Sequence, residues 1–100
     1  MHIISRKALV QFSNRHSDSR VALDDWYRIV SKAKWQHINE LKAVYPSADA
    51  VGNFTVFNIK GNKYRLIVSI SYKTQDVYIK YVLTHAEYDL GAWKNDPYFK

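Results

Sequence analysis

The chain has 100 residues, enough for one small domain, which excludes an enzyme with a separate nucleotide-binding domain. Hydrophobic residues make up 47% of it and cysteine is absent, so we expect a globular protein with neither a disulfide framework nor a thiolate metal site. Lys and Arg number 15 against 9 Asp and Glu, and the net charge of +6 favours a polyanionic partner such as nucleic acid.

The sequence predicts a single domain over residues 1–100 in the cytoplasm. No stretch approaches the roughly 20 apolar residues that a membrane helix needs, so no membrane partner is expected. The first residues, MHIISRKALVQF, lack the order of basic, apolar and small residues typical of a signal peptide.

The first third of the chain predicts a strand and two helices. Met1–Ile4 indicates a short strand, and Ser5 is a suitable cap for a helix that runs to about Arg15. The polar stretch His16–Arg20 indicates a turn, and a second helix is expected from about Val21 to Lys34. Its apolar positions follow the spacing of one helical face: Leu23, Trp26, Tyr27 and Val30.

The second half predicts three antiparallel strands. Segments rich in β-branched and aromatic residues run from Phe54 to Lys60, from Lys63 to Tyr72 and from Val77 to Thr84. Gly61-Asn62 is typical of a two-residue hairpin turn between the first two strands. We therefore expect an α+β fold of two layers in the order βααβββ, with two N-terminal helices packed on a small antiparallel sheet.

Alternation along these strands predicts two different faces. The face toward the helices collects Phe57, Ile59, Tyr64, Leu66, Val68 and Ile70. A turn at Thr74-Gln75 would place Thr84 beside Arg65 and Lys80 beside Ser69 on the other face. That face would then be open and would carry Asn58 with four cations: Lys60, Lys63, Arg65 and Lys80. Clustered cations favour a phosphate-bearing partner, although lysines on a solvated face also prevent edge-to-edge aggregation.

The end of the last strand adds a candidate for proton transfer. The run THAEYD brings His85, Glu87 and Tyr88 toward Arg65, and histidine titrates nearest neutral pH. Strict alternation sends His85 to the core face, so this site requires a bulge or the strand end to turn it outward. The other histidines, His2, His16 and His37, lack ligand spacing, and we expect no metal site and no cofactor.

Four segments together resemble the HigB-type toxins of the RelE superfamily, which belong to bacterial toxin–antitoxin systems. They are HIISRKAL near the start, LKAVYPSAD, VFNIKGNKYRLIV, and THAEYD near the end. The resemblance runs from Met1 to about Asp89. It implies a RelE-like fold, an endonuclease that cuts translated mRNA on the ribosome, and neutralisation by a helix-turn-helix antitoxin similar to HigA.

The resemblance also implies a chemistry without metal. The RNA 2′-OH attacks the adjacent phosphate and leaves a 2′,3′-cyclic phosphate and a 5′-OH, which requires a base, an acid and cations. By this likeness Arg65 binds the scissile phosphate and His85 is the general acid or base. Lys63 stabilises charge and Tyr88 orients the nucleophile or stacks on a base. Lys60 and Lys63 match basic positions around the hairpin, where they stabilise the transition state or hold ribosomal RNA, and Asn58 and Glu87 are weaker candidates. The predicted basic face adds Lys80 as an RNA contact.

Three readings remain open from the sequence. The chain is either the nuclease or a non-catalytic RNA- or ribosome-binding domain that uses the same basic face. A module that binds an acidic protein partner is a third reading, and it predicts only weak, non-specific RNA binding.

Overall fold

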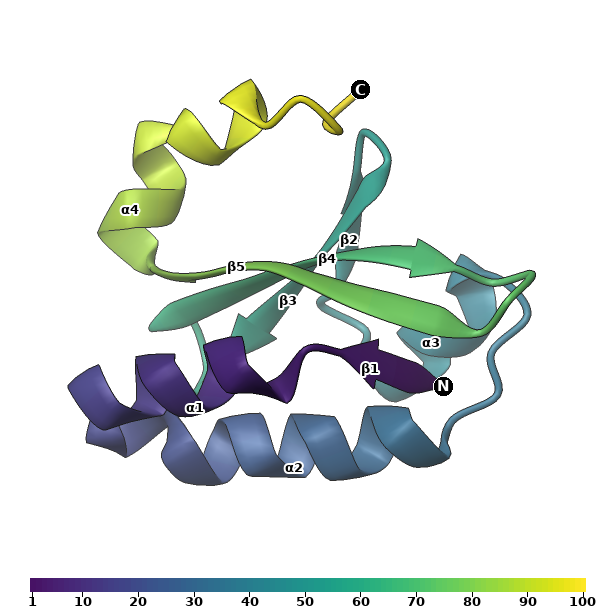
Figure 1. Cartoon of the computed structure of the whole chain (residues 1–100), viewed down its shortest axis with the longest axis horizontal. Helices are drawn as coiled ribbons and strands as arrows, with labels where there is room; N and C mark the ends of the chain where they lie inside the picture. Colours follow the sequence, from purple (N-terminus) through teal and green to yellow (C-terminus); the bar gives the residue numbers. More distant parts are fainter.

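The computed structural model describes all residues from Met1 to Lys100 and confirms the α+β class (Figure 1). One five-stranded sheet has the order β1-β5-β4-β3-β2. Its strands are β1 (His2–Ile4), β2 (Asp49–Val51), β3 (Phe54–Ile59), β4 (Tyr64–Ser71) and β5 (Asp76–Thr84). The helices are α1 (Arg6–Arg15), α2 (Arg20–Lys32), α3 (Ile38–Val44) and α4 (His85–Leu90), with 3₁₀ turns η1 (Ser17–Ser19) and η2 (Ala92–Asn95).

The helical layer forms as its sequence predicts. The Ser5 hydroxyl accepts the Lys7 N–H at 3.2 Å, which starts α1 where a cap was expected. Helices α1 and α2 lie together on one side of the sheet (Figure 1). Their buried side chains meet the expected face of β3 and β4 in one core cluster: Leu9, Phe12, Leu23, Trp26, Val30, Phe57, Ile59, Tyr64, Leu66 and Val68. Burial of this apolar surface is the main force that holds the layers together.

The β3–β4 hairpin has the predicted register. Ile59 pairs with Tyr64 and Asn58 with Arg65. The connection differs in detail, because the left-handed residues are Lys60 at φ 53° and Gly61 at φ 65° rather than Gly61 and Asn62. The loop therefore spans residues 60–63, and both of its lysines lie at the end of the hairpin.

The other face of the sheet is covered, and the expectation of an open face is wrong. Phe54, Val56 and Ile67 point to this side and form a second buried cluster with Trp93 of η2. The chain after β5 turns back over this face through α4 and η2 (Figure 1). The sequence interpretation placed only the polar residues there and left Val56 and Ile67 without a cover.

Two polar anchors hold the C-terminal segment in place. The Tyr81 hydroxyl donates to Asp96 at 2.7 Å, and this hydrogen bond lowers the pKa of Asp96. At the β2–β3 turn the Asn53 side chain donates to the Tyr98 carbonyl and accepts the Lys100 N–H. A Cβ on Gly52 would lie 2.3 Å from the Lys100 carbonyl oxygen, so this close approach requires glycine.

The β4–β5 register also differs from the expectation. Ser69 pairs with Tyr78 and Arg65 with Leu83, because the loop between the strands has four residues and a β-bulge interrupts the ladder at Ile67/Val68. The loop is fixed by the Gln75 side chain, which donates to the Trp35 carbonyl at 2.7 Å. The bulge shifts the remaining pairs by one residue, which exchanges the two faces of β5 beyond it.

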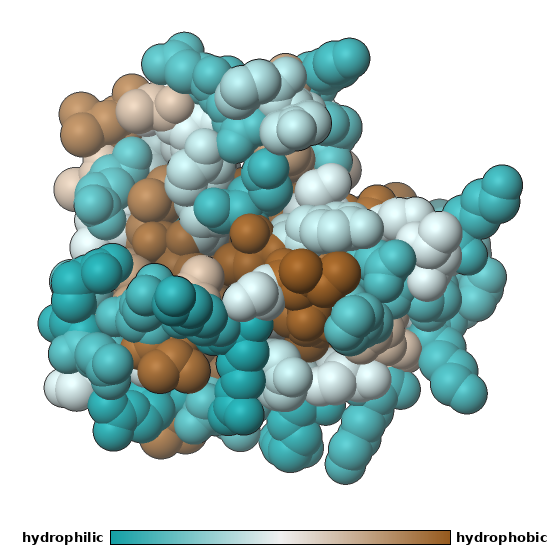
Figure 2. Space-filling model, viewed as in Figure 1, coloured by the Kyte–Doolittle hydropathy of each residue, from teal (hydrophilic) through white to brown (hydrophobic).

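Three further features complete the architecture. The three-residue strand β2 is too short for the sequence to indicate, and β1 joins β5 in parallel at the sheet edge. None of the helices is long and apolar enough to cross a membrane. The surface is largely polar over the helical layer, and apolar residues gather beside α4 and in the middle of the view (Figure 2). Leu90, the last residue of α4, is 83% exposed.

The covered face gives the first testable expectation. Trp93→Ala removes the largest side chain that seals the second cluster, and we expect it to lower the free energy of unfolding by about 3 kcal/mol. Leu90→Ala is the matched control and should change it by less than about 0.5 kcal/mol. Urea unfolding measures both, and equal midpoints for the two variants would contradict the covering role of η2.

Candidate functional site

The proposed site is an open pocket between the end of α1 and the start of α4, called here the α1–α4 pocket. Its volume is about 560 Å³. The lining residues come from three parts of the chain: Arg15, His16, Ser17, Asp18, Lys63, Tyr64, Thr84, His85 and Ala86. Two imidazoles, two fixed cations and one carboxylate therefore share one hollow. Groups of these types are what acid–base chemistry on a phosphate requires.

Asp18 of η1 organises the basic side of the pocket. Its carboxylate accepts hydrogen bonds from the Lys63 ammonium and, at 2.6 Å, from the Tyr64 hydroxyl. Lys60 is also close, with Nζ 3.9 Å from Oδ2 and 3.2 Å from the Asp18 carbonyl oxygen. The bonds from Lys63 and Tyr64 lower the pKa of Asp18 to about 2. Asp18 therefore remains a carboxylate at neutral pH and turns both loop lysines toward the helices.

The same contacts fix the protonation of its partners. The hydrogen bond to Asp18 raises the pKa of Lys63, and it also raises the pKa of Tyr64. Lys63 therefore remains a cation at neutral pH, and Tyr64 keeps its proton to donate to Asp18. Lys63 is suited to stabilising negative charge, not to accepting a proton.

His85 reaches the pocket because β5 ends one residue before it. Thr84 pairs with Tyr64 and caps α4: its hydroxyl accepts the Glu87 N–H at 3.2 Å, and Glu87 Oε1 accepts the Thr84 N–H at 2.9 Å. The His85 N–H donates to the Lys63 carbonyl at 3.1 Å. This cap starts α4 at His85, whose side chain is 50% exposed and lines the pocket on the helical side of the sheet. The expected turn of His85 onto the face that carries Arg65 is therefore wrong.

Asp89 orients the His85 ring. Its Oδ2 lies 2.9 Å from His85 Nδ1, one turn along α4. This contact leaves Nε2 as the ring nitrogen available to a molecule in the pocket. Glu87, a weaker candidate from sequence, is occupied in the cap instead.

Arg65, Tyr88 and Asn58 lie on the other face of the sheet and do not line the α1–α4 pocket. The Arg65 guanidinium lies 5.5 Å from the centre of the Tyr88 ring and donates to the Asn62 carbonyl at 2.9 Å. The Asn58 amide is 3.4 Å from the Asn62 side-chain oxygen. The structure brings Arg65 near Tyr88 and pairs it with Asn58, as the sequence predicted, but His85, which was expected beside them, lines the α1–α4 pocket instead.

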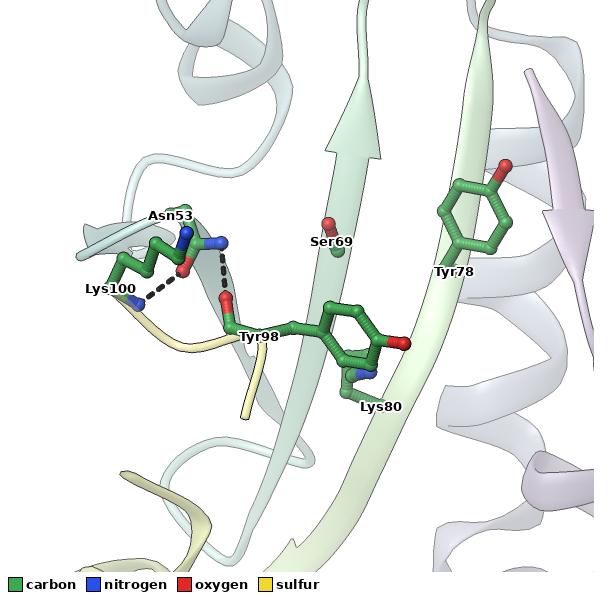
Figure 3. Close-up of a pocket in the computed structure, with 6 residues that line it drawn as sticks. All are labelled: Asn53, Ser69, Tyr78, Lys80, Tyr98 and Lys100. Atoms are coloured by element: carbon green, nitrogen blue, oxygen red, sulfur yellow. Dashed lines mark hydrogen bonds between the residues drawn. The ribbon is translucent and has the colours of Figure 1, made fainter. Parts of the chain in front are cut away.

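Lys80 belongs to a different part of the molecule (Figure 3). Its Nζ lies 3.7 Å from Asp96 and 4.6 Å from the centre of the Tyr98 ring. Together with Asn53 and Lys100 it lines a second pocket under the C-terminal segment. The expected face of four free cations is therefore wrong. Carboxylates hold three of the cations, and Arg65 alone remains on that face without one.

Sequence reasoning missed Arg15, His16 and Asp18. All three lie at the end of α1 or in η1, more than 40 residues before the hairpin that they meet. No local pattern in the sequence marks this contact. The structure places no three His, Asp or Glu side chains together as a metal would require.

Comparison with known proteins identifies the family. Residues 19–91 match the HigB toxin family, described as the RelE-like toxic component of a toxin–antitoxin system. The mRNA interferase toxin HigB of Escherichia coli K12 is 33% identical over 92 residues, which cover 89% of this chain and 88% of that protein. The mRNA interferase HigB of Shigella flexneri has the same identity and coverage. The chain belongs to the HigB toxin family, which confirms the resemblance seen in its sequence.

The Asp18 contacts predict acid sensitivity. Because its folded pKa of about 2 lies below the ordinary 3.8, its contribution to stability is complete above about pH 4 and is lost as the pH falls toward 2. Asp18→Asn should unfold at lower urea concentration than wild type at pH 6. The difference should shrink as the pH falls to 2.

Asp49→Asn, at an exposed carboxylate of β2, is the control and should leave the urea midpoint at pH 6 close to that of wild type. A difference between Asp18→Asn and wild type that stays constant from pH 6 to pH 2 would contradict the role of Asp18.

Proposed function

We propose that this chain is an endoribonuclease toxin, an mRNA interferase, that cuts translated mRNA and so arrests growth. The observation that carries the proposal is the α1–α4 pocket, where His85, oriented by Asp89 at 2.9 Å, stands beside the cations Lys63 and Arg15. Membership of the HigB toxin family and the mRNA interferase function named for its relatives support the same activity.

The proposed reaction is attack of an RNA 2′-OH on the adjacent phosphate. The 2′-oxygen gives up its proton to a base as it bonds to phosphorus, and the bond from phosphorus to the 5′-oxygen breaks. An acid then supplies a proton to the 5′-oxygen. The products are a 2′,3′-cyclic phosphate and a 5′-OH. The reaction consumes no water, and the proposed mechanism uses no metal ion.

The residues take distinct roles in this reaction. His85 transfers a proton through Nε2, because Asp89 occupies Nδ1. Lys63 stabilises the charge that develops on the phosphate, because its hydrogen bond to Asp18 fixes its position and raises its pKa.

Arg65 and Tyr88 bind the RNA next to the pocket. A guanidinium above a phenol ring offers one phosphate contact and one stacking surface. In this proposal Arg65 contacts a phosphate beside the scissile one, since it does not line the pocket. Lys60 and Asn58, at the same hairpin, extend the contact to mRNA or ribosomal RNA, and Lys80 is left out of this surface.

The partners follow from the toxin–antitoxin family. We propose mRNA on the ribosome as the substrate and a helix-turn-helix antitoxin as the protein that neutralises the toxin. Both place the chain in the cytoplasm.

His85→Ala tests catalysis. Inducible expression of wild type should arrest bacterial growth and produce new 5′ ends in translated messages, mapped by primer extension. We expect His85→Ala to cut roughly 10²- to 10⁴-fold more slowly, the usual loss on removing a general acid or base. His37→Ala removes an exposed histidine outside the pocket and should cut like wild type.

Growth arrest by wild type without new RNA ends would contradict the nuclease. It would favour the non-catalytic ribosome-binding function instead.

Arg65→Ala tests RNA binding by this residue. Affinity for a short single-stranded RNA, measured by fluorescence anisotropy between 50 and 300 mM salt, should fall. Its logarithmic salt dependence should weaken by about 0.7, the value expected when one fewer phosphate is neutralised. Lys94→Ala removes an exposed cation of η2 and should leave the salt dependence unchanged. Equal slopes for Arg65→Ala and wild type would remove Arg65 from the RNA surface.

A further inference from the structure

The proposed reaction needs two proton-transfer groups, and His85 is one of them. Resting on the proposed function, we infer that His16, at the end of α1, is the second, and that the two histidines act as a base and acid pair across the α1–α4 pocket. Both imidazoles line this pocket. The family match begins at Ser19, so nothing in that match assigns a role to His16.

The other titratable groups of the pocket are poorly suited to proton transfer near neutral pH. The Asp18 carboxylate accepts from Lys63 and Tyr64, and its pKa of about 2 makes it a poor proton acceptor at neutral pH. Hydrogen bonding to Asp18 raises the pKa of both Lys63 and Tyr64, so each holds its proton at neutral pH. The Arg15 guanidinium has hydrogen-bond donors only and no acceptor atom. His16 and His85 are the remaining side chains of the pocket, and imidazole is the side chain most often used as a general acid or base.

The His16 ring is fixed by apolar contacts, and its nitrogens remain unused. It stacks on Phe12 with ring centres 4.5 Å apart and an interplanar angle of 27°. The Tyr64 ring lies 5.4 Å away on another side. The backbone of His16 is also tied down, since its carbonyl accepts the Ser19 hydroxyl at 2.7 Å. No side-chain hydrogen bond or ion pair engages the imidazole, and His16 is a partly exposed residue that lines the pocket.

The sheet brings the two histidines to the same place. Tyr64, which contacts His16, pairs directly with Thr84, the residue before His85. The His85 N–H also donates to the carbonyl of Lys63, the residue before Tyr64. A phosphate beside Lys63 would therefore share the pocket with both imidazoles. In-line displacement needs a base at the attacking oxygen and an acid at the leaving oxygen, and the two histidines are the pair that we assign to these positions.

The contacts of each imidazole assign it to one of the two proton transfers, either from the 2′-OH or to the 5′-oxygen. Asp89 pairs with His85 Nδ1 at 2.9 Å, which suits a protonated ring that gives its Nε2 proton to the leaving 5′-oxygen. His16 has no carboxylate bonded to it, and in its neutral form it takes the 2′-OH proton. After cleavage His16 is protonated and His85 is neutral, so one proton has been taken and one given. Exchange with solvent restores both rings in the open pocket.

Kinetics of single-turnover cleavage test this pair. Purified wild type, His16→Ala and His16→Phe act on a synthetic mRNA bound to ribosomes, with the pH varied from 5 to 9. His16→Phe keeps the stack on Phe12 but has no nitrogen, so thermal unfolding should match wild type closely. We expect both variants to cut roughly 10²- to 10⁴-fold more slowly and to lose one limb of a bell-shaped pH profile. His37→Ala should retain both limbs.

Other charged and titratable groups that face His16 could also affect the pH profile. They come from α1, η1, the hairpin and α4: Arg15, Asp18, Lys60, Lys63, Tyr64 and His85. The pKa of Asp18 is about 2 and the pKa values of Lys63 and Tyr64 are raised, so these three groups do not account for a limb near neutral pH. His85 is the other imidazole of the pocket. The limb that remains in the His16 variants should therefore disappear when His85 is also replaced.

A modified substrate distinguishes base from acid. Replacing the bridging 5′-oxygen by sulfur gives a leaving group that departs without a proton. This substrate should restore cleavage by His85→Ala toward the wild-type rate, while His16→Phe should remain slow on it. Rescue of His16→Phe instead, or of neither variant, would contradict the assigned division.

Different results would contradict the role of His16 and the nuclease activity. If wild type cuts and His16→Phe cuts at the same rate with both limbs, His16 is not the second group, and the nuclease stands. If wild type cuts no RNA on or off the ribosome, the proposed function is wrong and the pair is wrong with it.

Discussion

The arrangement of the site depends on one carboxylate. Asp18 sits in the turn between the two long helices and binds three side chains of a hairpin more than 40 residues away: Lys60, Lys63 and Tyr64. These contacts close the hairpin end onto α1 and convert a loop of lysines into one wall of a pocket. Without this carboxylate, the positive charges of Lys60 and Lys63 would repel each other, and the hydrogen bonds from Lys63 and Tyr64 to η1 would be lost.

Much of the fold follows from local pattern, and the exceptions have physical causes. The cap at Ser5, the apolar stripe of α2 and the β3–β4 register all form as the sequence predicts. Alternation cannot locate a bulge, so the β4–β5 pairing was placed wrongly. Trp93 gave no periodic signal because η2 is a single turn, and the second face of the sheet was therefore expected to be open when it is covered.

The residues of the candidate site also fall into those that the sequence predicted and those that it did not. His85 and Lys63 lie in strongly patterned segments, and the sequence predicted both as site residues. It expected His85 on the face of Arg65, whereas the structure places His85 in the α1–α4 pocket. His16 and Asp18 lie in a polar turn, and their value depends on the long-range contact to Tyr64. A single sequence shows only the spacing of residues along the chain, whereas this pocket forms where three distant segments meet.

The chemistry of the RNA ends tests the central claim most directly, that imidazoles in the α1–α4 pocket drive attack by the 2′-OH. Message cut by the purified protein on ribosomes can be treated with polynucleotide kinase and phosphatase, and its ends analysed by mass spectrometry. The mechanism predicts a 2′,3′-cyclic phosphate on one fragment and a 5′-OH on the other. A 3′-OH with a 5′-phosphate would mean that water, not the 2′-OH, attacks the phosphate, and it would contradict the mechanism.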